Sequence, residues 1–143
     1  MLDVLKFKSP AASEQEQGKG RIAIDEVSIT FGSGASEHRA VETTSIDIAA
    51  GEFVCILGPS GCGKSTLLNA IAGYVKPTEG RVTVDDVLIE KPGPDRGMVF
   101  QQYSLLPWKT VYENVAFGPK MAGQNRASAG STANTFLELV GLK

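Results

Sequence analysis

Alternation and clustering of hydrophobic residues along the chain predict a mixed α/β fold. The segments RIAIDEVSITF (residues 21–31) and VETTSIDI (residues 41–48) alternate apolar and polar side chains, as expected of strands with one face in water. FVCIL (residues 53–57) is apolar throughout, which suits a strand buried on both faces within a parallel sheet. RVTVDDVLIE (residues 81–90) predicts two short strands around a tight turn at Asp85 and Asp86. GSGASEHRA (residues 32–40), between the first two strands, is expected to be a flexible loop. We therefore expect antiparallel strands on either side of one buried, parallel-type strand.

Helical spacing begins soon after the apolar run at residues 53–57. Leucine, isoleucine and alanine recur at intervals of three and four residues up to residue 72, which predicts a helix starting at residue 65. A second helix is predicted in STANTFLELVG (residues 131–141), with Phe136, Leu137 and Val140 on one face and Gly141 as its C-terminal cap. Residues 1–20, by contrast, end in a polar stretch without periodicity. We expect a disordered extension there, followed by one domain over residues 21–143.

A glycine-rich segment joins the predicted strand at residues 53–57 to the helix that follows. Its spacing, Gly58-x-x-x-x-Gly63-Lys64-Ser65, matches the phosphate-binding loop, in which main-chain N–H groups and a helix N-terminus surround an anion. In that pattern the lysine reaches the β- and γ-phosphates and the serine hydroxyl binds Mg²⁺. The alternative is a glycine-rich turn with a solvated lysine. The residues expected to contact nucleotide here are Gly58, Pro59, Ser60, Gly61, Cys62, Gly63, Lys64, Ser65 and Thr66.

Composition narrows the class of protein without changing this picture. The chain has 143 residues, enough for one domain or part of one, and its net charge of −2 gives no electrostatic reason to expect nucleic-acid binding. No apolar run approaches the roughly 20 residues of a membrane-spanning helix, and the N-terminus is too polar for a signal peptide. Cys55 and Cys62 suggest no disulfide framework; we expect Cys55 in the core and Cys62 as a small loop residue. These features are consistent with a cytosolic chain.

Several longer segments match one family in both order and spacing. They are EVSITFGSG, GEFVCILGPSGCGKSTLLNAIAG, PTEGRVTVDD, PGPDRGMVFQQYSLLPWKTVYENVAFG and LELVGLK, which cover nearly all of residues 21–143. On these segments the chain resembles the ATP-binding subunit of an ABC transporter. Residues 92–118 are similar to importers of the nitrate, sulfonate and taurine group. The resemblance implies an α/β fold with a P-loop NTPase (RecA-like) core and an antiparallel β subdomain.

The same resemblance assigns roles to residues outside the phosphate-binding loop. Phe31 matches the aromatic residue that stacks on adenine; the alternative is a core aromatic at a strand end. Gln101 matches the glutamine that joins Mg²⁺ and the attacking water to the membrane-domain interface, so Lys64 and Gln101 are the expected catalytic residues. The expected Mg²⁺ ligands are Ser65 and Gln101. Three apolar residues are expected to face a membrane subunit, although the leucines suit packing under the loop nearly as well: Leu105, Leu106 and Trp108.

Three catalytic elements of the family lie beyond the segment VGL at residues 140–142: the signature sequence, the Walker B aspartate with its adjacent glutamate, and the switch histidine. This sequence stops at Lys143. We therefore expect this sequence to be roughly the N-terminal half of the domain, truncated before the signature helix and the Walker B strand. It should bind ATP and Mg²⁺ but not hydrolyse ATP by itself. The complete protein is expected to couple MgATP hydrolysis to uptake of an anion of the nitrate, sulfonate or taurine type.

The resemblance also implies partners and a location. The partners are transmembrane permease subunits, a second ATP-binding subunit in a head-to-tail dimer, and a periplasmic or extracellular substrate-binding protein, without nucleic acid. The location is cytoplasmic, peripheral on the inner face of the cell membrane. Two other functions stay open: a non-transport ABC-type ATPase, and a binding-only or regulatory half-domain. A co-encoded permease gene would exclude the first, and a reading frame continuing through a signature sequence would exclude the second.

Overall fold

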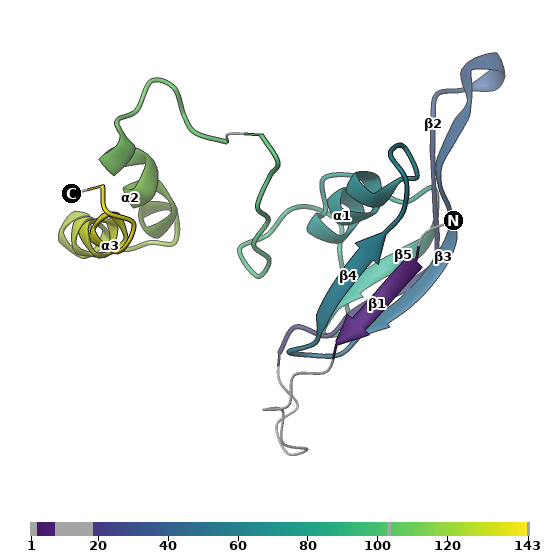
Figure 1. The fold of residues 1–143 in the computed structure, drawn as a ribbon, viewed down its shortest axis with the longest axis horizontal. Helices are drawn as coiled ribbons and strands as arrows, with labels where there is room; N and C mark the ends of the chain where they lie inside the picture. Colours follow the sequence, from purple (N-terminus) through teal and green to yellow (C-terminus); the bar gives the residue numbers. More distant parts are fainter. Residues whose placement is uncertain (1–2, 8–18, 103, 143) are drawn as a thin grey trace. The chain divides into compact units, whose positions relative to one another are not determined.

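The structure, a computed structural model, describes residues 3–7, 19–102 and 104–142 and divides into two units, Met1–Gly97 and Met98–Lys143. Within the described residues, the first unit holds the strands and one α-helix, and the second unit holds two α-helices (Figure 1). In chain order the elements are β1 (Asp3–Phe7), β2 (Ile22–Phe31), the 3₁₀ turn η1 (Gly34–Ser36), β3 (His38–Ile48), β4 (Phe53–Leu57), α1 (Lys64–Ala72), β5 (Glu79–Val84), β6 (Val87–Leu88), α2 (Val111–Met121) and α3 (Arg126–Leu139).

Four strands of the first unit form an antiparallel sheet in the order β3-β2-β5-β6, as the alternating segments of the sequence predict. β2 and β3 pair as far as Phe31 opposite His38, so their hairpin closes over residues 32–37. The pairing of β2 is interrupted after Ile24 on the β3 side and after Asp25 on the β5 side, and Glu26 there has a φ of 49°. Such a bulge bends the strand and increases its twist. The sheet is therefore curved where it meets the rest of the unit.

The strand β4 differs from expectation in both its pairing and its burial. It pairs antiparallel with β1, so that Asp3 lies opposite Leu57 and Phe7 opposite Phe53. Phe53 and Leu57 leave 66% and 48% of their surface exposed, and the residues between them, including Cys55, are half-buried. The prediction of a strand buried on both faces of a parallel sheet is wrong for the described residues, because β1 is the only strand that pairs with β4 there.

The strand β1 also corrects the expectation that residues 1–20 are disordered. Asp3–Phe7 form a regular strand, and Val4 packs against the core of the first unit. The polar stretch on which the prediction of disorder rests falls mostly on residues 8–18, which lie outside the described residues. The polar sequence without periodicity, on which the prediction was based, thus begins only after β1.

The hydrophobic core of the first unit lies between the four-stranded sheet, the β1–β4 pair and α1 (Figure 1). Val27, Ile29 and Val41 from the sheet are fully buried, and α1 contributes Leu67 and Ala70, which lie three residues apart on one face. This packing holds the N-terminus of α1, and hence the loop before it, at a set position against the sheet.

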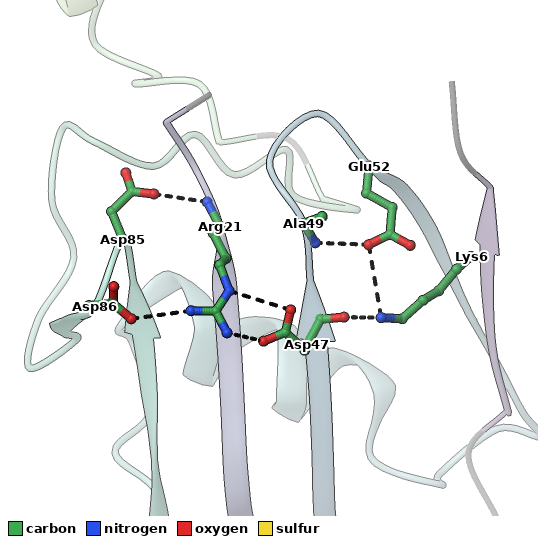
Figure 2. A network of polar contacts seen from close by, with 7 residues as sticks. All are labelled: Lys6, Arg21, Asp47, Ala49, Glu52, Asp85 and Asp86. Carbon is green, nitrogen blue, oxygen red and sulfur yellow. Dashed lines mark hydrogen bonds and ion pairs between the residues drawn. The ribbon is translucent and has the colours of Figure 1, made fainter. Parts of the chain in front are cut away.

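Polar contacts join the strands at the end of the first unit where β4 begins (Figure 2). The Arg21 guanidinium pairs with the carboxylate of Asp47 and, at 3.2 Å, with that of Asp86. The hydrogen bond to Asp47 is the main cause that raises the pKa of Arg21. Asp85 and Asp86 have φ of 49° and 63° and make the predicted two-residue turn between β5 and β6. The Asp85 carboxylate accepts hydrogen bonds from the N–H groups of Gly20 and Arg21, at 2.8 and 2.9 Å.

The same network reaches β1 through Lys6. Its ammonium donates to the main-chain oxygen of Asp47 and lies 3.9 Å from a carboxylate oxygen of Glu52. Glu52 also accepts a hydrogen bond from the Ala49 N–H at 2.8 Å, within the turn that leads into β4 (Figure 2). These contacts tie β1 to the turn before β4, so the two-stranded pair is attached to the larger sheet at its start.

The helices of the second unit pack together through small residues. Ala116 of α2 and Ala129 and Ala133 of α3 are fully buried. A Cβ placed on Gly130 would lie 2.6 Å from the hydroxyl oxygen of Tyr112, so a side chain there would displace the Tyr112 ring. Small residues at such a contact let two helix backbones approach closely. Neither these helices nor any other within the described ranges is long and apolar enough to cross a membrane.

The end of α3 agrees with the sequence in its cap but not in its buried face. Gly141 has a φ of 71°, its N–H donates to the Glu138 carbonyl, and the Leu142 N–H donates to the Leu137 carbonyl. This pair of bonds is a Schellman motif, which confirms the predicted glycine cap. The predicted apolar face is wrong in part: Leu137 is buried, whereas Phe136 and Val140 are 54% and 64% exposed. The helix instead buries a row of alanines ending at Leu137, because its partner helix lies on that side.

Candidate nucleotide-binding site

The loop between β4 and α1 brings several unpaired main-chain donors to one place. Gly61 and Gly63 have φ of 84° and 91°, a left-handed conformation that glycine adopts without strain. Gly63 is the N-cap of α1, and no side chain caps this helix end. The first bond of the helix runs from the Leu67 N–H to the Gly63 carbonyl at 2.8 Å, so the three N–H groups before Leu67 have no main-chain acceptor among the described residues. An anion suits this site, because both the free N–H groups and the helix dipole favour negative charge.

The strand β3 lies directly against this loop. A Cβ added to Gly63 would lie 2.2 Å from the Ala40 carbonyl oxygen and 3.0 Å from Cγ2 of Val41, a fully buried residue. A Cβ added to Gly61 would meet nothing within 4 Å. The base of the loop is therefore seated on a buried strand, while Gly61 faces open space in which a phosphate group has room.

The side chain of Lys64 folds back over the loop. Its ammonium donates to the carbonyl oxygens of Gly58 and Pro59, at 2.8 and 2.7 Å, and lies 3.5 Å from the Cys62 sulfur. Cys62, like Lys64, is half-buried. The ammonium thus stabilises the loop in this conformation and places one full positive charge beside the free N–H groups. Phosphate oxygens would offer it charged acceptors, which make stronger hydrogen bonds than carbonyl oxygens do.

A cavity of about 340 Å³ opens beside the loop and gathers residues from three elements. Phe31, predicted to stack on adenine, lines this cavity and is 46% exposed. The structure therefore brings Phe31 together with the phosphate-binding loop, as the predicted role requires. The sequence analysis did not find two residues of β3 that line the same cavity, because it treated the segment before Val41 as a flexible loop. The full lining is Phe31, His38, Ala40, Gly61, Gly63, Lys64, Ser65 and Thr66.

The groups around this cavity fit MgATP. A half-exposed aromatic ring suits a base, and the ammonium and free N–H groups suit a triphosphate. The hydroxyls of Ser65 and Thr66 face the same space, and Ser65 is the residue there that is expected to hold Mg²⁺. Among the described residues, no carboxylate lines this cavity, and no three His, Cys, Asp or Glu side chains gather to hold a metal ion.

The remaining predicted site residues belong to the second unit. Gln101 is exposed in the irregular segment before α2, and its role at Mg²⁺ stays a prediction. Leu105 and Trp108 leave 65% and 76% of their surface exposed, whereas Leu106 is half-buried. Two of the three apolar residues are thus accessible to a partner, and the third is partly covered.

Asn114 of α2 holds this segment, and the sequence analysis did not find it. Its side-chain amide donates to the carbonyl oxygens of Leu106, Lys109 and Thr110, at 3.2, 3.2 and 2.9 Å, and accepts from the Leu106 N–H at 2.8 Å. Thr110 and Glu113 form a capping box at the start of α2, and hydrogen bonds from Thr110 lower the pKa of the Glu113 carboxyl. The loop that presents Trp108 is therefore fixed to α2. Hydrophobic patterns carry no signal for such a residue, because its role depends on carbonyl groups that converge only in the folded loop.

A family model described as ABC transporter matches residues 41–143 of this chain. The chain belongs to the ABC transporter family. Proteins named taurine import ATP-binding protein TauB are similar to it: that of Rhizobium johnstonii is 50% identical over 123 residues, and that of Burkholderia pseudomallei is 46% identical over 122 residues. Each match covers 85% of this chain and 47% of the relative. The chain thus spans about half the length of these ABC transporter relatives.

Solved structures of ABC proteins share the fold. The ATP-binding cassette MJ0796, in a dimeric post-hydrolysis state bound to ADP and Pi, matches with a TM-score of 0.71 and 30% identity, over 85% of this chain and 58% of that chain. A bacterial Atm1-family ABC exporter with ATP bound matches with a TM-score of 0.54 and 27% identity, over 77% of this chain and 20% of that chain. The predicted fold class, a P-loop NTPase with an antiparallel β subdomain, is confirmed.

Proposed function

We propose that this chain is the nucleotide-binding part of an ATP-binding subunit in an ABC import complex, which couples MgATP binding and hydrolysis to uptake. The observation that carries the proposal is the cavity in which Phe31, Lys64 and the uncapped start of α1 meet. An aromatic ring face, a positive side chain and an anion-attracting helix end correspond in kind to the base and the phosphates of a nucleotide.

In this proposal each group has a separate task. The loop N–H groups orient the triphosphate, and the Lys64 ammonium exchanges its bonds with the Gly58 and Pro59 carbonyls for bonds to phosphate oxygens. Phe31 stacks on the base and excludes water from one side of it. Ser65 and Gln101 hold Mg²⁺, which when bound neutralises charge on the phosphate oxygens. Because no carboxylate lines the cavity among the described residues, polarisation of the attacking water is assigned to a group outside them.

The substrate and the partners are inferred from the relatives and from the exposed loop of the second unit. Relatives named as taurine import proteins support a small sulfonate such as taurine as the transported molecule. Exposed Leu105 and Trp108, on a loop held by Asn114, suit contact with a permease subunit. The proposed complex also contains a second ATP-binding subunit and a substrate-binding protein, with this subunit on the cytoplasmic face of the membrane.

The substitution Lys64→Ala tests the nucleotide site. The affinity for MgATP, measured by isothermal titration calorimetry, should fall about 10- to 150-fold, the equivalent of about 1.5–3 kcal/mol for a hydrogen bond to a charged group. Lys76→Ala is the matched control, because Lys76 is exposed, follows α1 and is not part of the cavity lining. If the 143-residue polypeptide precipitates, the same variants are measured in this chain joined to the C-terminal half of an ABC cassette. Equal affinities for Lys64→Ala and the unsubstituted chain would overturn the proposal.

A further inference from the structure

His38 lies beside the aromatic residue of the nucleotide cavity. It is the one histidine in the sequence and the first residue of β3, and it lies directly opposite Phe31 across the β2–β3 pair. Residues opposite each other in an antiparallel pair point to the same face, with Cβ atoms about 4.5–5.5 Å apart. Both side chains line the cavity of about 340 Å³. His38 is exposed, and its side chain has no hydrogen bond or ion pair within the part of the chain that the structure describes, so its ring nitrogens are accessible to a ligand.

His38 and the charged residue that follows it line different cavities. The register of the β2–β3 pair shifts between Val41 and Arg39, and beyond this shift His38 lies opposite Phe31 and lines the nucleotide cavity. The guanidinium of Arg39 instead pairs with Glu42 at 3.5 Å and Glu79 at 3.6 Å, and Arg39 lines a different cavity of about 670 Å³. Of these two residues, only His38 lines the nucleotide cavity, and the Arg39 guanidinium is held by Glu42 and Glu79.

We propose that His38 is a specificity-determining residue that contacts the nucleoside part of the bound nucleotide, opposite Phe31. This inference rests on the proposed nucleotide function. Lys64 and the loop N–H groups account for the phosphates, and Phe31 offers the base only the face of a ring. Stacking on an aromatic ring tolerates any base, because every base has a π-face. An imidazole beside that ring adds a directed hydrogen bond to the sugar or to an edge of the base.

Comparison of MgATP with magnesium tripolyphosphate tests this role, because tripolyphosphate has the phosphates but no nucleoside. His38→Ala should weaken MgATP binding about 3- to 10-fold, the scale of one hydrogen bond, and leave tripolyphosphate binding unchanged. Lys76→Ala is the control: Lys76 is exposed and is not part of the cavity lining, so neither affinity should change. His38→Gln keeps a hydrogen-bonding group and should restore part of the loss. An unchanged MgATP affinity in His38→Ala, or equal losses for both ligands, would overturn the proposal.

A second measurement leaves the cavity intact. In a ¹H–¹³C spectrum the imidazole signal of His38, identified by its absence from His38→Gln, should shift when MgATP is added but not with magnesium tripolyphosphate. No shift, or the same shift with both ligands, contradicts a contact with the nucleoside. Lys64→Ala keeps the two proposals apart. If Lys64→Ala loses MgATP binding while His38→Ala retains it, only the role of His38 fails; if Lys64→Ala also retains it, the nucleotide site itself fails.

Discussion

Replacing Gly63 with alanine measures how closely β3 seats the phosphate-binding loop, and Gly61→Ala is its matched control. The two glycines have φ of 91° and 84°, so the backbone strain of an alanine should be nearly the same at both positions. Their surroundings differ. A Cβ at position 63 would lie 2.2 Å from the Ala40 carbonyl oxygen, whereas a Cβ at position 61 would have no neighbour within 4 Å.

The expected losses of stability follow from these two geometries. Gly61→Ala should cost only the strain of a left-handed residue, about 1–2 kcal/mol. In Gly63→Ala the new methyl group and the Ala40 oxygen must also move apart by about 1 Å to reach ordinary contact. Since the next residue, Val41, is fully buried, that movement disturbs the core, and overpacking of this kind costs about 1–3 kcal/mol more. The total of about 2–5 kcal/mol is a large part of a typical domain's stability.

Urea unfolding followed by circular dichroism measures both variants, without nucleotide, because a bound phosphate would occupy the space around Gly61. The midpoint for Gly63→Ala should fall about twice as far as that for Gly61→Ala, or the variant should fail to fold while Gly61→Ala still folds. Equal midpoints for the two variants would refute the conclusion that β3 presses on the base of the loop.

Three further predictions concern the cap of α2, the loop cysteine and hydrolysis. The lowered pKa of Glu113 means that its carboxylate stabilises the folded state above the ordinary value of 4.5 and loses this effect as the pH falls through the lowered value. The urea midpoints of Glu113→Gln and the unsubstituted chain should therefore differ at pH 7 and converge as the solution is acidified; a constant difference would contradict the capping box. Maleimide should label half-buried Cys62, and saturating MgATP should slow this reaction; labelling at the same rate with and without nucleotide would argue against binding at the loop. Phosphate release by the 143-residue chain should not exceed that of Lys64→Ala, and measurable turnover would require a catalytic carboxylate that does not line the cavity among the described residues.

Strands and turns whose formation depends on residues close together in the sequence could be predicted well. Alternation located β2, β3 and β5, and the paired aspartates at the β5–β6 turn were recognised by their turn chemistry. The loop from Gly58 to Ser65 was found from spacing alone, because its glycines, lysine and hydroxyl are adjacent in sequence. Its neighbours in space are different. An apolar run such as Phe53–Leu57 reports that a strand avoids water but not which strand pairs with it, and its partner β1 lies some 50 residues away in the sequence.

The role of His38 could not be predicted because the register of a hairpin is a tertiary property. The small and polar residues between Phe31 and Val41 were interpreted as a long flexible loop, whereas β3 begins three residues before Val41. Only that earlier start brings His38 opposite Phe31. Phe31 was found through a resemblance, which carries residues that match a motif. His38 stands at a position for which the motif prescribes no residue type, so the resemblance gave no indication of its role.

The register of β3 against β2 also restricts where this hairpin can gain or lose residues during evolution. Residues 32–37 form its tip, and insertions there lengthen an exposed turn without altering which face each later residue occupies. A single insertion between His38 and Ala40 would shift the register of the strand end, so that His38 no longer lies opposite Phe31. Length variation among homologous chains should therefore collect at the tip and be absent from residues 38–41, even though His38 and Arg39 are as exposed as the tip.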